Sequence, residues 1–252
     1  MTRAVLDQFK KLAERAYNNV YQEFERSARP IGTVLLPAAG TGQAFVALNS
    51  PPPHVNSIEV HGAVRMDNLP RQRKLDPTLS RHNSGISVLL DSLDIYKFER
   101  DKPALDNSFL YQSTVRLGYF TSAKGKWSPL LCVRYDFQKS HDAHPLFHAQ
   151  LESGMPSAAL KALFPDMPVV EKPLNIHTNV RLPTANVIGA TALLSLAADH
   201  LPLVKFPEIL RTIRKQGLFN GEWRCECNSM DMKALPDAVL SSRWYSTNLV
   251  AP

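Results

Sequence analysis

Apolar residues recur at three- and four-residue steps through the N-terminal segment of the chain. The apolar positions are Val5, Phe9, Leu12, Ala16, Val20 and Phe24, and most residues between them are charged or polar. This spacing collects the apolar side chains on one face of an α-helix, and Pro30 ends the pattern. It predicts an amphipathic helix over residues 3–27.

The middle of the chain alternates apolar and polar residues, which is the period of a half-buried strand. In residues 108–120 one face is expected to carry Phe109, Tyr111, Val115, Leu117 and Tyr119, and the other Gln112, Thr114 and Arg116. In residues 127–138 the face expected to pack on the core carries Leu131, Val133, Tyr135 and Phe137. The opposite face is expected to carry Cys132, Arg134 and Asp136. Residues 85–99 are a third strand candidate. This pattern predicts an antiparallel sheet with one packed face and one polar face.

Two helices are predicted near the C-terminus. The first starts in residues 182–201, with Thr184 as N-cap after Pro183, and the second spans 207–217, from Pro207 to Gly217. The expected class is α+β in a single domain over residues 1–252. Its parts are an N-terminal helix (1–30), an extended, proline-rich and basic segment (31–83), an antiparallel sheet (84–152) and a C-terminal helical part (153–252).

The composition is that of an ordinary globular protein with an excess of positive charge. Of 252 residues, 44% are hydrophobic, and 29 Lys and Arg exceed 23 Asp and Glu. A positive net charge favours an anionic partner. Residues 63–83 have no periodicity, so we expect a loop there, and the helix at 207–217 has a basic face. We expect nucleic-acid contacts from Arg65, Arg71, Arg73, Lys74, Arg81, Arg211, Arg214 and Lys215, unless these residues form a solvated loop and helix face.

Cysteine usage and hydropathy indicate a compartment. The three cysteines are too few and too poorly spaced for a disulfide framework. The N-terminal segment is charged throughout and has no apolar core of a signal peptide. The longest apolar stretch, residues 185–201, is too short and too polar to span a bilayer. The expected protein is cytoplasmic and has no membrane partner.

Residues 33–45, "TVLLPAAGTGQAF", resemble the phosphate-binding entry loop of sugar-nucleotide and cytidylyl transferases. In those enzymes a basic residue follows the second glycine, where this chain has Gln43. The stretch that follows, "VALNSPPPH", also contains no lysine or arginine to hold a triphosphate. We therefore expect Gly40 and Gly42 to form a turn between two short strands.

Residues 133–152 gather histidines and carboxylates. They contain His141, His144, His148, Asp136, Asp142 and Glu152. If residues 146–152 form a strand, His148 and Glu152 share a face, and a hairpin sets them beside Arg134 and Asp136. If they form a helix from Pro145, then His144, His148 and Glu152 recur at four-residue steps, a spacing that can chelate a metal. We favour the strand, because the preceding alternation predicts a return strand.

Either arrangement can support chemistry. A divalent metal, zinc or manganese, would be held by His141, His144, His148 and Asp136, and the catalytic groups would be Asp136, His148 and Arg134. The alternative is a hydrogen-bonded patch in which Arg134 pairs with Asp136 or Glu152. No standard zinc spacing is matched, which favours the patch.

The same segment resembles a group of uncharacterised bacterial proteins whose centre reads Arg-x-Asp, a short polar loop, then His-Pro-x-x-His-x-Gln. The matching positions are Arg134, Asp136, His144, Pro145, His148 and Gln150. The resemblance implies a protein of a mobile or antiviral defence locus, with another protein of that locus as a possible partner. The expected function is a nucleic-acid-associated or complex-forming accessory protein. The alternative is a metal-dependent hydrolase, such as a phosphodiesterase or nuclease.

Overall fold

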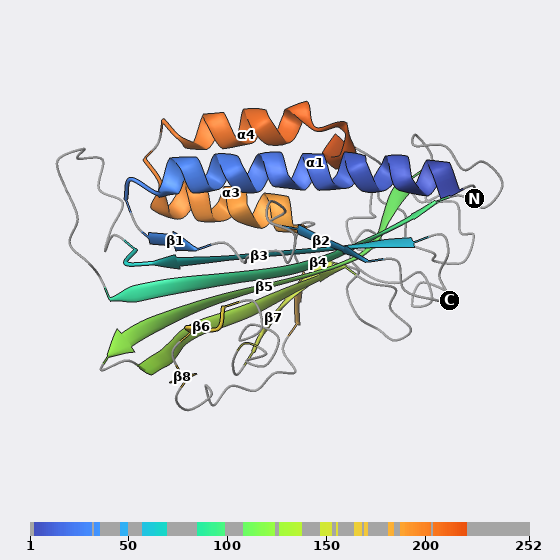
Figure 1. Cartoon of the computed structure of the whole chain (residues 1–252). Helices are drawn as coiled ribbons and strands as arrows, with labels where there is room; N and C mark the ends of the chain where they lie inside the picture. The colour runs from blue at the N-terminus through green and yellow to red at the C-terminus, as the bar shows by residue number, and fades with distance from the viewer. Residues whose placement is uncertain are drawn as a thin grey trace, which may run out of the picture.

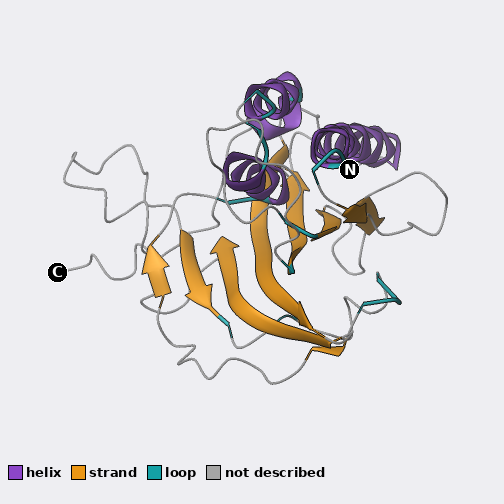
Figure 2. Cartoon of the chain, turned by 90° about the vertical axis from the view of Figure 1, so that its left-hand side faces the viewer, coloured by secondary structure: helices purple, strands orange, loops and turns teal. Residues whose placement is uncertain are grey.

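A layer of helices covers one face of a curved antiparallel sheet (Figures 1 and 2). The computed structural model describes residues 3–31, 33–35, 46–49, 57–69, 85–98, 108–123, 126–137, 147–152, 155, 164–167, 169–170, 181–183, 187–202 and 204–220. The predicted α+β class is confirmed.

Helix α1 spans Arg3–Ala28, as its apolar period predicts. Its buried side is formed by Phe9, Ala13, Ala16, Tyr17, Val20, Tyr21, Phe24 and Ala28. Two tyrosines therefore belong to the packed face, whereas Leu12, expected there, is 40% exposed. Helices α3 (Gly189–His200) and α4 (Phe206–Lys215) pack against α1 and against each other, and a short 3₁₀ helix, η2 (Gly217–Asn220), follows.

The described residues contain nine strands in one sheet, in the order β1-β3-β4-β5-β6-β7-β9. Strand β2 pairs with β3 antiparallel, and β8 pairs with β6 parallel. The bounds are β1 Thr33–Leu35, β2 Val46–Asn49, β3 Ser57–Asp67, β4 Ile86–Phe98, β5 Ser108–Ala123, β6 Lys126–Phe137, β7 Phe147–Leu151, β8 Val169–Val170 and β9 Arg181–Pro183.

The alternation in β5 and β6 is confirmed over most of their length. Val115, Leu117 and Tyr135 pack into the core under the helices, and Arg116 lies opposite Arg134 on the other face. The predictions for Phe109 and Leu131 are wrong, and Leu131 is 40% exposed. Ile95 of β4 pairs with Gln112 of β5, but Tyr96 pairs with Leu110, so β5 has one extra residue, a bulge, at this point. The bulge inverts the faces of the part of β5 that precedes it, and Leu110 enters the core in place of Phe109.

Two predicted boundaries are also wrong. Residues 63–67, expected in a loop, belong to β3, which pairs with β4 over ten positions. Gly62 interrupts the apolar alternation of this strand, because the Tyr21 side chain packs directly on its backbone. In the predicted C-terminal helical part, β8 and β9 are strands, and the helix starts at Gly189. The predicted N-cap Thr184 and the predicted turn at Gly40 and Gly42 lie outside the described residues.

Each face of the sheet carries its own core. The large core lies between the helices and the sheet and includes Phe9, Tyr17, Val64 and Leu193. A small core lies on the other face and consists of Ala63, Leu89, Phe120, Trp127, Cys132, Phe164 and Met167. Beside the small core, the same face carries a dense group of charged side chains. In the part of the chain that the structure describes, no helix is long and apolar enough to cross a membrane.

Candidate functional site: the charged face of the sheet

Two rows of polar residues cross the face of the sheet away from the helices. The first row runs Asp91–Arg116–Arg134–Gln150 across β4, β5, β6 and β7. The second runs Thr114–Asp136–His148 across β5, β6 and β7. Directly opposed residues of an antiparallel sheet lie close enough for their side chains to interact. The register therefore brings together Arg134, Asp136 and His148, as the strand interpretation of residues 146–152 predicts.

Arg134 is the centre of this group. Its Nε donates to Asp136 Oδ2 at 2.6 Å, one terminal nitrogen donates to Glu152 Oε1 at 2.6 Å, and the other donates to Gln150 Oε1 at 3.2 Å. Charge-assisted hydrogen bonds of this length are among the strong ones. Burial lowers the pKa of Arg134. The hydrogen bonds to Asp136 and Glu152 and the negative charges of these two carboxylates outweigh burial, so the pKa is raised overall. The predicted pairing of Arg134 with these carboxylates is confirmed.

Asp136 and His148 are both almost completely buried. Their side chains are 3% and 2% exposed, and His148 Nε2 lies 3.5 Å from Asp136 Oδ2. Thr114 Oγ1 donates to the other carboxylate oxygen at 3.1 Å. Burial alone would raise the pKa of Asp136, but the neighbouring His148 and the hydrogen bond from Arg134 prevail and lower it. The carboxylate of Asp136 is thus held ionised inside the protein.

Glu152 joins the two arginines of the first row. It accepts from Arg134 and lies 3.7 Å from Arg116 Nε, and Arg116 in turn lies 3.5 Å from Asp91. Burial raises the pKa of Asp91, and Arg116 opposes this effect. The face therefore holds cations and carboxylates in alternation, which stabilises the β5–β6–β7 register.

Only some of the predicted metal ligands belong to the residues that the structure describes. His148 and Asp136 are neighbours, whereas His141 and His144 lie outside the described residues. Within the described ranges, no group of three or more His, Cys, Asp or Glu side chains could hold a metal ion. The four-ligand metal site stays a prediction.

A second polar cluster lies within the large core and was not predicted. The carboxylate of Asp94, on β4, accepts hydrogen bonds from Tyr17 Oη at 2.6 Å, Ser113 Oγ at 2.5 Å and the backbone N–H of Gly189 at 3.2 Å. Tyr96 Oη lies 2.8 Å from Tyr17 Oη. Since the Tyr17 proton is directed at Asp94, Tyr96 donates to Tyr17. The cluster connects α1, β4, β5 and the start of α3.

The charge state of Asp94 depends on its burial. The residue is fully buried, and this raises its pKa to about 6, although the donors from Ser113, Tyr17 and Gly189 oppose the rise. The sequence does contain a signal for this cluster. Asp94 occupies an apolar-face position in the alternation Val88, Leu90, Ser92, Asp94, Tyr96. A carboxylate at such a position needs buried partners.

The predicted nucleic-acid contacts differ in accessibility. Arg211, Arg214 and Lys215 are exposed on α4, whereas Arg71, Arg73, Lys74 and Arg81 lie outside the described residues. Arg65, expected in a mobile loop, is on β3 and is 7% exposed. Its guanidinium lies 2.8 Å from Asp67 and 4.8 Å above the ring of Trp127. These contacts leave Arg65 little surface for a phosphate group, so its assignment is corrected to a structural role.

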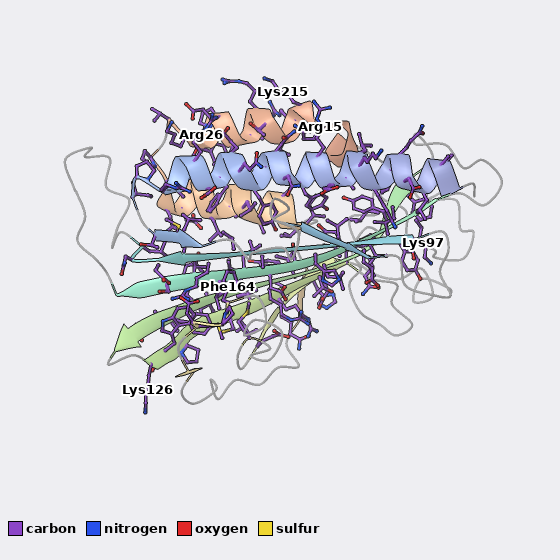
Figure 3. The ribbon with its side chains drawn as sticks, in the orientation of Figure 1. Arg15, Arg26, Lys97, Lys126, Phe164 and Lys215 are labelled. Atoms are coloured by element: carbon purple, nitrogen blue, oxygen red, sulfur yellow. The ribbon has the colours of Figure 1, made fainter. Side chains whose placement is uncertain are left out.

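Further cations lie beside α4. Figure 3 shows Arg15 and Arg26 of α1 and Lys215 of α4 on the side of the molecule that faces away from the sheet. All three are exposed, and α1 and α4 are in contact. The sequence prediction includes the basic residues of α4 but not those of α1, because only the fold brings the two helices together.

Comparisons with known proteins yield no relative. No protein-family model matches the chain, and neither the curated proteins nor the solved structures contain a significant match. The resemblance of residues 134–150 to uncharacterised bacterial proteins stays a prediction.

Proposed function

We propose that the protein is a nucleic-acid-associated accessory protein that binds a phosphate backbone with the outer surface of α1 and α4. The proposal is carried by one observation: Arg15, Arg26 and Lys215 lie on the same side of the molecule (Figure 3). Helix α4 has three basic residues and one acidic residue. Lysine and arginine that bind phosphates release condensed counterions, which favours binding at low salt. The net charge of +6 acts in the same direction.

The biological setting is part of the proposal. The motif of Arg134, Asp136, His148 and Gln150 supports a bacterial protein of a mobile or antiviral defence locus. The small number of cysteines supports a cytoplasmic location. A protein of the same locus with an acidic surface is the alternative partner for the α1–α4 surface.

The test is a binding titration with fluorescently labelled DNA and RNA at salt concentrations from about 50 to 200 mM. The variant Arg211→Ala/Lys215→Ala is expected to weaken binding about tenfold or more. It should also make the slope of log K against log salt shallower by about 2, because each lost phosphate contact removes about 0.9.

A matched control separates a local contact from a general loss of charge. Lys215→Ala and Lys126→Ala remove the same charge, and Lys126 is exposed at the opposite end of the molecule (Figure 3). Lys215→Ala should weaken binding more than Lys126→Ala. Equal effects would remove the α1–α4 surface from the interface. If the unmodified protein binds neither DNA nor RNA at about 50 mM salt, the proposed function is wrong.

The predicted basic loop is tested separately. Arg71→Ala/Arg73→Ala/Lys74→Ala should make the salt slope shallower by a further 2 to 3, on the order of 0.9 for each lost contact. An unchanged slope would limit the interface to the helices.

One observation favours a second function, a metal-dependent hydrolase acting on a phosphodiester. Asp136 and His148 are cross-strand neighbours, with 3.5 Å between His148 Nε2 and Asp136 Oδ2. The proposal adds His141 and His144 as ligands, because a catalytic zinc site needs three protein ligands and an open position for water.

Metal analysis of protein purified without chelator tests this second proposal. Near-stoichiometric zinc or manganese is expected, and His148→Ala should release it. His61→Ala is the control, since His61 lies on the same face of the sheet and pairs with Glu59, away from Asp136. Protein that contains no metal and takes up none after addition of zinc or manganese would exclude the hydrolase.

A further inference from the structure

A shallow groove lies between α1 and α4. It has a volume of about 340 Å³ and is lined by Asn19, Gln22, Glu23, Arg26, Thr212 and Gln216. The lining consists of amides, a hydroxyl, one carboxylate and one guanidinium. Besides arginine and lysine, these amide and hydroxyl groups are the ones that proteins direct at phosphate and sugar oxygens.

The groove is organised by its own hydrogen bonds. Asn19 Nδ2 donates to Gln216 Oε1 at 3.4 Å, and Gln216 Nε2 donates to the Thr212 carbonyl at 3.2 Å. A side-chain amide nitrogen carries two N–H groups, so each has a second donor for a ligand. The acidic residue of the groove, Glu23, is 10% exposed and forms an ion pair with Arg26. The Arg26 side chain is 76% exposed, so its guanidinium has further N–H groups that can donate to a ligand.

Cations stand along both sides of the groove. Arg15 and Arg26 are eleven residues apart on α1, which is about three helical turns and about 16 Å along the axis. They therefore point to nearly the same side. On α4, Arg211 and Lys215 are one turn apart and adjoin the groove residues Thr212 and Gln216.

Resting on the proposed function, we infer that this groove binds the sugar–phosphate backbone of double-stranded nucleic acid, independently of base sequence. Two properties of the surface select the duplex. Unpaired bases are held by stacking on aromatic side chains. The exposed large apolar residues in the described part of the chain are Leu12, Leu130, Leu131, Leu182 and Val204, none of which is aromatic.

The second property is the fixed spacing of the cations. A duplex carries one charge per 1.7 Å of its axis, against 3.4 Å for one strand, and it presents these charges in a fixed array. A span of about 16 Å along α1 corresponds to about five base pairs of such an array. A flexible single strand would have to be ordered before it could meet the same cations.

The experiment compares a labelled duplex of about 16 base pairs with one of its strands, in two unrelated base sequences, at about 100 mM salt. The duplex is expected to bind at least tenfold more tightly than the strand, and the two sequences should agree within about twofold. Gln22→Ala/Gln216→Ala should weaken duplex binding about fivefold and leave the salt slope unchanged, because it removes neutral groups. Gln8→Ala, an exposed amide on the same helix outside the groove, is the matched control and should change binding less than twofold.

The outcomes distinguish this inference from the proposed function. Equal or tighter binding of the single strand, or a more than tenfold difference between the two sequences, would overturn the duplex inference and leave the accessory function intact. A groove variant that binds like Gln8→Ala would also overturn it. The absence of binding to every nucleic acid at low salt would refute both.

Discussion

The Tyr17 hydroxyl donates a 2.6 Å hydrogen bond to the buried carboxylate of Asp94, 77 residues later in the chain. This contact joins α1 to the central strand β4. The backbone N–H of Gly189 donates to the same carboxylate oxygen, so Asp94 also positions the start of α3. Burial raises the pKa of Tyr17, so its hydroxyl stays protonated and remains a donor.

Tyr17→Phe is expected to lower the free energy of unfolding by about 1 to 3 kcal/mol. The ring is retained, so the loss of stability reports the cost of leaving the buried Asp94 carboxylate with one hydrogen-bond donor fewer. Tyr111→Phe is the control, because it removes a hydroxyl from a tyrosine that is only partly buried. The ring of Tyr111, which Lys97 overlies, is retained in phenylalanine. Urea denaturation monitored by circular dichroism gives both values, and equal losses would contradict a special role for the Tyr17 hydroxyl.

Asp94 should make stability depend on pH. Its pKa rises from 3.8 to about 6 on folding, so the folded state binds the proton more tightly. The stabilising contribution is complete below about pH 4 and is lost as the pH rises through about 6, by on the order of 3 kcal/mol. Asp94→Asn does not titrate there.

The stability difference between the unmodified protein and Asp94→Asn isolates this residue from other titrating groups. The unmodified protein should lose its advantage over the variant between about pH 4 and 7. Denaturation at several pH values measures the difference, and one that stays constant over this range would show that Asp94 is not the titrating group.

Gly62→Ala should destabilise the protein by about 1 to 3 kcal/mol through overpacking. A Cβ at Gly62 would lie 2.7 Å from Cζ of Tyr21, whose ring is fully buried and cannot move aside. Gly217→Ala is the control, since a Cβ there meets no atom within 4 Å. Thermal unfolding compares the two variants, and a melting temperature of Gly62→Ala equal to that of Gly217→Ala would disprove the close packing of Tyr21.

Arg134→Met should cost about 3 to 5 kcal/mol, because it leaves buried Asp136 and half-buried Glu152 without their main cation. Arg116→Met is the matched control and should cost less, since its ion-pair distances are 3.5 and 3.7 Å. Chemical denaturation at pH 7 tests the order of the two losses. An equal or larger effect of Arg116→Met would show that Arg134 is not the centre of the charged face.

The residues with a strong local period were predicted well from sequence. The apolar steps of α1 and the alternation in β4, β5 and β6 identify these elements, because burial of one face needs only the right side chain at every second, third or fourth position. The same alternation placed Arg116, Arg134 and Asp136 on the polar face. The return strand β7, which sets His148 opposite Asp136, follows from this pattern and is confirmed.

Tertiary structure decided what depends on distant residues. The β5 bulge, the inclusion of residues 63–67 in β3 and the burial of Arg65 against Trp127 all depend on the neighbouring strand or on the opposite side of a core. The Tyr17–Asp94 bond and the groove between α1 and α4 join segments that no local period connects. Local periodicity therefore determined the elements and their faces. Packing between distant segments determined which polar groups meet, because buried charge is stable only where the fold supplies its partner.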